Sequence, residues 1–347
     1  MELPKYNGNI HPEEWLKQVQ THCYLKGVEN EIQILKICKL MIDSTIIIPK
    51  DINSFDELIK SLKSHTTFTI FKNSCKRKLQ LMKYNPGKEE NYTASFLANF
   101  RSLCNYAEIN DPDELKTLLV NSYSNYFFKI EFAKRVDNID PKESPYYIDE
   151  LVKLFNEVIL DELKIIKSDS LIALKHVTTG RYLSSCDIKY QTGSRRNIVF
   201  AGEKFYNSHS IWLLSKIKSH RLNQQNMVFY NDEFHFRHKE TNNLFWLSYN
   251  YKSPTTRQSE AFCNYETYNA CWQIINLESK NRTHNDNNTL YVNSKDIIKL
   301  KIIGDGQDLY LRSHDFTFTI NDETFQEVVG HEDRIGANDE WCIELIE

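Results

Sequence analysis

The sequence lacks most of the patterns that mark an enzyme. Its 347 residues include only ten glycines, and no glycine-rich phosphate loop, zinc-binding histidine pair or nucleophile elbow is present. His235 and His238, the tightest histidine pair, would point to opposite faces of a strand and so cannot easily share a metal. Ser313-His314-Asp315 has the residue types of a catalytic triad, but triads assemble in space, so we interpret it as a polar turn. We therefore predict a non-enzymatic protein with no cofactor and no metal.

Long apolar runs are also missing. The densest, Ile32–Ile48, is interrupted by polar residues and falls short of the roughly 20 apolar residues of a membrane span. The first residues lack the apolar core of a secretory signal. The eight cysteines form no Cys-x-x-Cys pair and lie within apolar patterns, as buried, reduced thiols do. These features predict a cytoplasmic protein that does not insert into membranes.

Neither sign of charge dominates, since 43 basic residues face 47 acidic ones for a net charge of −4. The one dense basic run, Lys72–Lys78, is less than a protein that binds phosphate backbones usually carries. We interpret it as the solvated face of a helix and do not expect a nucleic acid partner. With 41% hydrophobic residues, 19 Phe and 19 Tyr, the chain is long and apolar enough for two folded domains.

Residues 1–166 carry the 3.6-residue apolar rhythm of an all-helical domain. Capping residues mark helix starts at His11-Pro12, Ser54–Glu57, Asp111-Pro112 and Ser144-Pro145. The segment Ile32–Ile42 is apolar nearly all round, which predicts a central, buried helix. We expect six or seven helices, packed as one bundle or as two small lobes.

Three features of this half carry a resemblance to a known family. They are the stretch Leu3-Pro4-Lys5-Tyr6-Asn7-Gly8, then Trp15 in the first helix, then Glu90 followed by Phe96, Phe100 and Leu103. In this order they resemble the capsid region of retrotransposon Gag proteins. The resemblance implies weak self-association, a homo-oligomer built through residues 1–166. The zinc knuckle, the protease motif and the basic tail of the family are missing, so genome packaging is not implied. The alternative is a helical bundle that shares only the apolar pattern.

From Ser168 onward, short β-type segments and turn residues replace the helical rhythm, and one unit occurs three times. Each copy opens on a predicted hairpin, at Leu174–Ser185, Phe236–Ser248 and Leu300–Ser313. Each continues with a short β segment and closes on a tryptophan, namely Trp212, Trp272 and Trp341, spaced by 60 and 69 residues. Three four-stranded units that close a barrel form a β-trefoil. The predicted fold is thus multidomain α + β: a helical bundle at 1–166, then an all-β, three-repeat trefoil at 168–347.

The segments His176–Ser185 and Asn338–Ile343 resemble the MIR domain, a module of protein O-mannosyltransferases and of inositol trisphosphate and ryanodine receptors. The resemblance spans residues 168–347 and implies a binding module without defining its ligand. His176 and His238 recur at equivalent turns, so we predict that they, like the three tryptophans, have a structural role. Five side chains near the hairpins are the candidate ligand contacts: Arg181, Tyr182, Trp246, Tyr310 and Arg312. Aromatic rings can stack on sugars, and arginines can bind carboxylate or phosphate.

Three hypotheses about function remain open. The first is an interaction protein, with a self-associating helical domain and a trefoil that binds a protein or glycan partner. The second is a glycan-binding accessory factor of glycosylation-type processes, in which the trefoil carries the activity. The third is a cryptic transferase or hydrolase. The sequence does not identify the ligand, the biological process or the oligomeric state.

Overall fold

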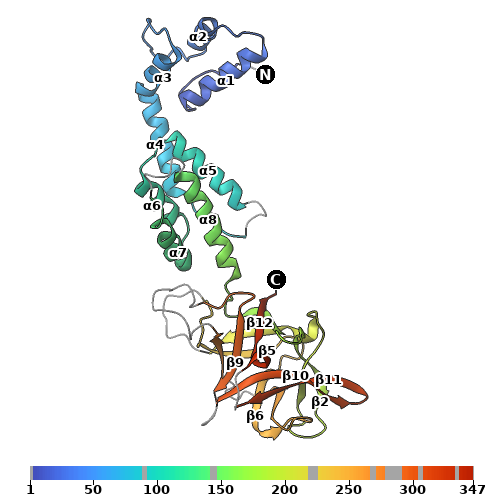
Figure 1. Cartoon of the computed structure of the whole chain (residues 1–347). Coiled ribbons are helices and arrows are strands. Elements are labelled where there is room, and N and C mark those ends of the chain that lie inside the picture. The colour runs from blue at the N-terminus through green and yellow to red at the C-terminus, as the bar shows by residue number, and fades with distance from the viewer. Residues whose placement is uncertain are drawn as a thin grey trace. The chain divides into compact units, whose positions relative to one another are not determined.

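The structure is a computed structural model that describes residues 3–87, 92–140, 147–217, 226–265, 271–277, 291–303, 308–332 and 336–346. The chain divides into two compact units, residues 1–160 and 161–347, here called the helical unit and the barrel unit (Figure 1). Ile166 belongs to the apolar core of the barrel unit. The sequence predicts a domain boundary at 166–168, whereas the two compact units meet at 160–161. The predicted boundary stays a prediction.

Eight helices lie in the described part of the chain, where six or seven were expected. They are α1 (Pro12–Leu25), α2 (Glu31–Leu40), α3 (Phe55–Ser64), α4 (Thr66–Leu81), α5 (Tyr92–Tyr106), α6 (Pro112–Ser122), α7 (Tyr126–Val136) and α8 (Tyr147–Lys164). The prediction named no start for α4 or α7, which lack acidic residues in their first turns and are capped by His65 and Asn125. The predicted helix start at Ser144-Pro145 lies outside the described residues.

Helix α2 is not the central, buried helix that its composition suggested. Ile32 is 67% exposed and Leu40 is 81% exposed, and only Ile34, Leu35 and Cys38 are buried. The helix packs on α1 through that one face. The prediction was wrong because an apolar pattern does not show whether a neighbouring element exists to cover each face.

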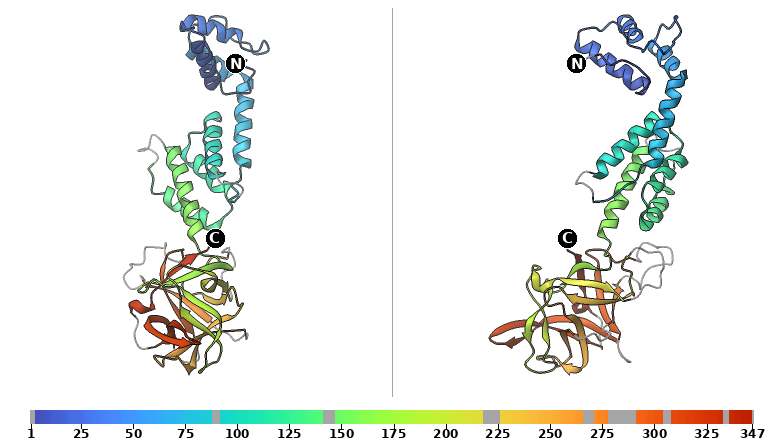
Figure 2. Two further views of the ribbon diagram at one scale, coloured as in Figure 1. Left: turned by 90° about the vertical axis from the view of Figure 1, so that its right-hand side faces the viewer. Right: turned by 180° about the vertical axis from the view of Figure 1, so that it is seen from behind.

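Two apolar clusters organise the helical unit, one built from residues 6–62 and one from stacked aromatic rings. In the first, the indole N–H of Trp15 donates to the carbonyl of Pro4 at 2.8 Å, and the Tyr6 ring lies 5.1 Å from the Trp15 ring. In the second, Phe155 contacts Phe96 and Phe128 at ring distances of 5.6 and 4.7 Å. Of the residues that carry the capsid resemblance, Tyr6, Trp15, Phe96, Phe100 and Leu103 are buried, whereas Glu90 lies outside the described residues. Figure 2 shows the ribbon of the helices from two further sides.

Twelve antiparallel strands lie in the described part of the barrel unit. They are β1 (Ser170–His176), β2 (Leu183–Lys189), β3 (Asn197–Ala201), β4 (Trp212–Lys216), β5 (Glu233–His238), β6 (Leu244–Lys252), β7 (Ser259–Asn264), β8 (Cys271–Asn276), β9 (Ile297–Ile303), β10 (Asp308–Ile320), β11 (Glu323–His331) and β12 (Trp341–Leu345). Six of them close a ring in the order β1, β4, β5, β8, β9, β12. The other six form three hairpins, β2–β3, β6–β7 and β10–β11, whose second strands pair with one another.

The predicted opening hairpins pair less than the sequence suggested. β1 meets β2 only through a bridge between Lys175 and Tyr182, and β5 meets β6 only between Arg237 and Leu244. The reason is that the first strand of each repeat belongs to the barrel, whereas the second pairs mainly with the third. Each repeat therefore contributes two barrel strands and one hairpin.

A further three-fold feature precedes each repeat and was not found in the sequence. The backbone N–H groups of Ile166, Val228 and Val292 donate in a closed cycle, to the carbonyls of Val292, Ile166 and Val228 at 2.9, 3.0 and 2.9 Å. All three side chains are fully buried. This ring of hydrogen bonds satisfies backbone groups that the barrel would otherwise bury without partners.

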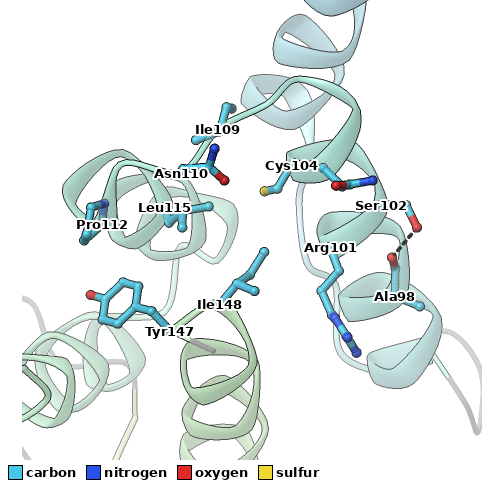
Figure 3. A pocket seen from close by; sticks show the side chains of 11 residues that line it. Ala98, Arg101, Ser102, Cys104, Ile109, Asn110, Pro112, Leu115, Tyr147 and Ile148 are labelled. Carbon is cyan, nitrogen blue, oxygen red and sulfur yellow. Dashed lines mark hydrogen bonds between the residues drawn. The ribbon is translucent and has the colours of Figure 1, made fainter. Parts of the chain in front are cut away.

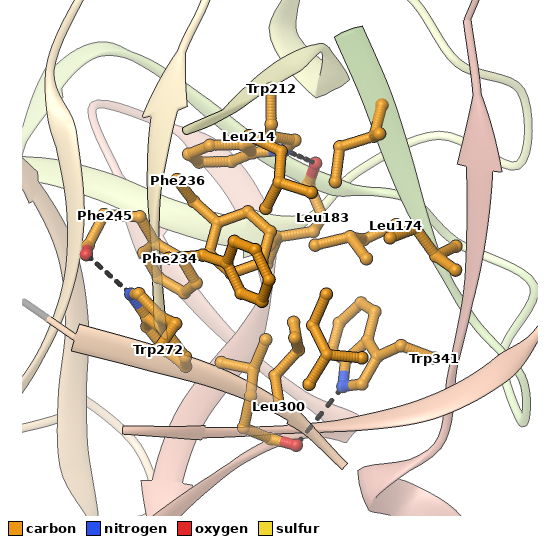
Figure 4. Close-up of a cluster of buried hydrophobic side chains, with 14 of the residues drawn as sticks. Leu174, Leu183, Trp212, Leu214, Phe234, Phe236, Phe245, Trp272, Leu300 and Trp341 are labelled. Atoms are coloured by element: carbon orange, nitrogen blue, oxygen red, sulfur yellow. Dashed lines mark hydrogen bonds between the residues drawn. The ribbon is translucent and has the colours of Figure 1, made fainter. Parts of the chain in front are cut away.

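The three closing tryptophans lie in the barrel core, and none of them is exposed to solvent. The indole N–H of Trp212 donates to Leu183, that of Trp272 to Phe245 and that of Trp341 to Leu311, in each case to the backbone carbonyl at 2.9 to 3.2 Å. Figure 4 shows these bonds around the packed side chains. Each tryptophan therefore connects the last strand of its repeat to the second strand of the same repeat by a hydrogen bond.

Candidate functional site

His176 and His238 occupy matching structural positions rather than a shared site. The Nδ1 atom of each lies 3.0 Å from a threonine hydroxyl, on Thr179 and Thr241 respectively. The Nε2 atom of each lies 2.9 Å from a backbone carbonyl oxygen, so it is Nε2 that carries the proton. Burial lowers the pKa of both histidines. Each ring also lies about 5 Å from a closing tryptophan.

The five candidate ligand contacts do not converge on one place. Tyr182 is buried, and its hydroxyl donates to Glu344 at 2.7 Å. Trp246 packs against the barrel core, and Tyr310 is half-buried. Only Arg181 and Arg312 line grooves, and the two grooves are different.

The strand registers show that the two grooves are equivalent positions of the three-fold repeat. One residue pair occupies the same position in each of the three hairpins. These equivalent pairs are Leu183 with Ala201, Phe245 with Cys263 and Leu311 with Gly330. The tip of a hairpin is the turn between its two strands, and the base is the opposite, open end. In this register, each groove lies between the base of one hairpin and the tip of the hairpin of the preceding repeat. Groove A joins the base of repeat 1 to the tip of repeat 3, and groove B joins the base of repeat 3 to the tip of repeat 2.

Groove A has a volume of about 720 Å³ and offers mostly hydrogen-bonding groups. Its lining consists of Thr178, Thr179, Arg181, Phe200, Ala201, Gly202, Glu203, Lys204, Asp315, Thr317, Glu323, Thr324, Phe325 and Gln326. The Gln326 amide reaches Thr179 of the other repeat at 3.4 Å and Ser313 at 2.9 Å. Arg181 donates to the carbonyl of Gly202 at 2.7 Å. These bonds fix the groups of the groove floor in place.

Aromatic rings accompany this polar lining. Phe200 and Phe325 meet edge to face with ring centroids 4.8 Å apart. Within two positions of lining residues in the sequence, Phe205 is 65% exposed, Tyr206 51% and Phe316 59%. Large exposed aromatic side chains are the usual partners of a sugar face or of another protein's surface.

Groove B, of about 430 Å³, is lined by Lys252, Arg257, Gln258, Ser259, Leu309, Arg312, Gly330, His331 and Glu332. Its base is held by Asp339, which accepts hydrogen bonds from Arg312 at 2.8 and 3.2 Å and from His331 at 3.0 Å. Burial alone would raise the pKa of Asp339, but the bonds from His331 and Arg312 outweigh it and lower that pKa. At the third equivalent position, the guanidinium of Arg196 lies 5.9 Å from the centre of the Tyr265 ring.

The helical unit has a pocket of its own, of about 710 Å³, between α5, α6 and the start of α8 (Figure 3). Cys104 and Arg101 lie in its wall. Burial raises the pKa of Cys104 to about 12, which makes its thiol a poor nucleophile. Arg101 pairs with Asp149 at 3.0 Å. This pocket therefore offers neither a reactive thiol nor an unpaired arginine to a ligand.

Metal and membrane features are absent from the described ranges. No group of three or more His, Cys, Asp or Glu side chains there is placed to hold a metal ion. None of the helices in the same ranges combines the length and apolarity needed to cross a bilayer. All eight cysteines have free thiols. The predicted lack of a cofactor, a metal and catalysis stays a prediction.

No family model matches the sequence, and no curated protein matches it. Similar solved structures include the SDF2-like protein from Arabidopsis thaliana, at 22% identity over 52% of this chain and 94% of that chain, with a TM-score of 0.43. The S. cerevisiae protein O-mannosyltransferase Pmt1-Pmt2 complex bound to the sugar donor is 18% identical over 80% of this chain and 43% of that chain, with a TM-score of 0.42. A ricin B-like lectin from Macrolepiota procera in complex with lactose is 10% identical over 52% and 99%, with a TM-score of 0.30. At these scores the likenesses assign the chain to no family.

The grooves contain residues that the sequence alone did not single out, above all Gln326, Lys252, Arg257 and His331. They lie on the second and third strands of the repeats and on the turns between them, whereas the motifs that are visible in the sequence lie in the opening segments and at the tryptophans. An alignment of the hairpin tips of the three repeats would have matched Lys252 with Thr317 and Arg257 with Thr324. The change from a neutral to a basic side chain at these matched positions was the signal in the sequence.

Proposed function

We propose that the chain is a non-enzymatic binding protein whose barrel unit is a MIR-type β-trefoil that captures a glycan in groove A. The observation that carries this proposal is the composition of groove A. Hydroxyl, amide and carboxylate groups from two repeats surround a volume of about 720 Å³, which lies in the usual range of small-ligand sites. A sugar matches such a groove because it offers many hydroxyl groups to hydrogen-bond and a flat C–H face to stack on aromatic rings.

The charge of groove A favours a neutral ligand. Three acidic side chains, Glu203, Asp315 and Glu323, line it beside two basic ones, Arg181 and Lys204. Carboxylates accept hydrogen bonds from hydroxyl groups, and such charge-assisted bonds are stronger than neutral ones. A neutral, hydroxyl-rich ligand uses both signs of charge, whereas an anionic one would meet the carboxylates.

The experiment is a glycan array with the full chain, followed by titration of the best ligand. Glu323→Gln removes one exposed charge from groove A, and we expect roughly tenfold weaker binding, the effect of losing one charge-assisted bond. Glu233→Gln, an equally exposed change in β5 outside the groove, is the control and leaves affinity unchanged. If no glycan binds, or both variants bind like the parent, the glycan assignment is wrong and a protein partner takes its place.

The helical unit supports a second candidate function, weak self-association as its capsid resemblance implies. Five large apolar side chains within the first 47 residues are more than two-thirds exposed, namely Tyr24, Leu25, Ile32, Leu40 and Ile47. Exposed apolar side chains are typical of contacts between proteins where they form one continuous patch, and this candidate function requires such a patch. Residues 1–167 carry 23 basic and 24 acidic side chains, so long-range repulsion does not oppose contact between copies.

Sedimentation velocity of the full chain across a wide concentration range tests this second function. Contacts worth only about 5–6 kcal/mol populate dimers at ~100 μM. We expect concentration-dependent association that Leu40→Glu abolishes. Val177→Glu, at a 43% exposed position of the barrel unit, leaves it intact. A strict monomer at ~100 μM would mean that the resemblance is ancestry without surviving assembly.

A further inference from the structure

Groove B has the same place in the fold as groove A but opposite chemistry. The registers pair Lys252 with Ser259 and Thr317 with Gln326, so Lys252 of groove B stands where groove A has Thr317. By the same count Arg257 replaces Thr324, and His331 replaces Gly202. A neutral set of positions in one groove is thus basic in the other.

Among the described residues that line groove B, basic side chains outnumber acidic ones. Three cations, Lys252, Arg257 and Arg312, line it with one acid, Glu332. The buried carboxylate of Asp339 balances Arg312 from behind. Lys252 and Arg257 are exposed, and within the residues that the structure describes no ion pair involves either of them. Lys252 and Arg257, which form no ion pair within those residues, therefore face a groove whose floor pair, Arg312 with Asp339, is neutral overall.

The floor of groove B is preorganised. Arg312 is bound through two nitrogens to Asp339, and its side chain is 18% exposed. Asp339 also accepts the backbone N–H of Gly336 at 2.6 Å and the Nε2–H of His331 at 3.0 Å. A guanidinium held in one orientation loses little entropy when a ligand arrives.

We propose that groove B binds the phosphate of a small phosphorylated sugar, with Lys252 and Arg257 as its direct contacts and Arg312 as the fixed charge at the floor. A phosphate monoester carries about 1.5 to 2 negative charges at neutral pH, which matches two cations without counter-charges better than a single carboxylate does. The volume of about 430 Å³ lies at the small end of ligand sites, which favours a compact ligand over an extended peptide. This site is separate from groove A and does not depend on the glycan proposed there.

The test is calorimetric titration of the full chain with glucose 6-phosphate, with glucose, inorganic phosphate and a phosphoserine peptide as separate arms. We expect glucose 6-phosphate to bind most tightly and to weaken as salt rises, because salt screens exposed charges. Arg257→Gly should weaken that binding about tenfold, the effect of one lost charge-assisted hydrogen bond. Glycine is chosen because the backbone φ of Arg257 is +60°, a conformation that glycine adopts without strain.

Arg195→Gly is the matched control, since Arg195 is an exposed arginine with φ of +55° on the turn of the first hairpin, outside groove B. It should leave the affinity unchanged. Lys252→Gln provides a second groove B variant in a strand, free of any turn effect. Equal losses in Arg195→Gly, or no binding of glucose 6-phosphate at ~10 mM, would overturn the proposal. Inorganic phosphate or the peptide binding more tightly than glucose 6-phosphate would rule out the sugar.

Discussion

Trp272 offers a direct measure of how strongly the repeat holds the barrel together. Its side chain is fully buried, its ring stacks on Phe245 with centroids 4.5 Å apart, and its N–H donates to the Phe245 carbonyl at 3.0 Å. Replacing it with alanine leaves a large cavity, breaks the stacking and leaves a buried carbonyl without its donor. We predict that Trp272→Ala destabilises the barrel unit and leaves the helical unit folded.

The size of the effect follows from these contacts. Truncating a buried aromatic side chain to alanine costs about 3–5 kcal/mol, a large part of the 5–15 kcal/mol that stabilises a typical domain. For a unit of 187 residues (161 to 347), this corresponds to a melting temperature lower by about 6–20 °C. Trp272→Phe retains most of the packing and removes the N–H, so we expect an intermediate loss of about 1–3 kcal/mol.

Urea denaturation of the full chain, followed by near-ultraviolet circular dichroism for packing and by ellipticity at helical wavelengths, separates the two units. Trp246→Phe is the control, because Trp246 lies on β6 and is only partly buried. It should change stability less than Trp272→Phe does. If Trp272→Ala keeps the parent's unfolding midpoint, the tryptophan is not the structural residue that the repeat implies.

Two further predictions concern pH and backbone conformation. Burial lowers the pKa of His176 and His238 below the ordinary 6.5. As the pH falls, these two histidines therefore bind protons in the unfolded chain before they do so in the folded one. The stability of the barrel unit is thus greatest above about pH 6.5 and declines in acid. Urea midpoints at several pH values test this, and replacing both histidines with glutamine should flatten the acid side; an unchanged slope contradicts it. Gly193→Ala should cost more stability than Gly180→Ala, although both glycines have a φ near +70°. The reason is that a Cβ on Gly193 would lie 2.1 Å from the Glu260 carboxylate, whereas a Cβ on Gly180 meets no atom closer than 4.0 Å. Left-handed backbone alone costs about 1–2 kcal/mol, so thermal unfolding that ranks the two variants equally would contradict the close contact.

The repeat in the barrel unit could be predicted from sequence because its signals are large and periodic. Trp212, Trp272 and Trp341 stand in register with the opening segments, and their burial follows from the closed barrel. The hydrogen-bonded ring of Ile166, Val228 and Val292 was missed because it is formed by backbone groups. Short apolar pairs such as Ile165-Ile166 occur throughout the chain, so side-chain patterns do not distinguish them.

The exposed surface of the helical unit could not be predicted in the same way. A helix that is apolar on several faces predicts burial, yet Leu40 and Ile32 of α2 are exposed while Ile34 and Leu35 are buried. Which face is covered depends on where α1 lies, and that position is set by contacts far apart in the sequence. The same exposed residues that made the prediction wrong are those that favour contact with a second copy.

The three repeats separate fold from function by where they agree and where they differ. Positions that agree in chemistry, such as His176 and His238 or the closing tryptophans, are buried and bonded within the barrel. The register of the hairpins makes Ser184, Trp246 and Arg312 equivalent, and these three have different chemistry. A position that the fold does not constrain to one residue type is free to serve a ligand. Binding specificity in this chain should therefore change when residues are exchanged between equivalent grooves, while the barrel itself stays folded.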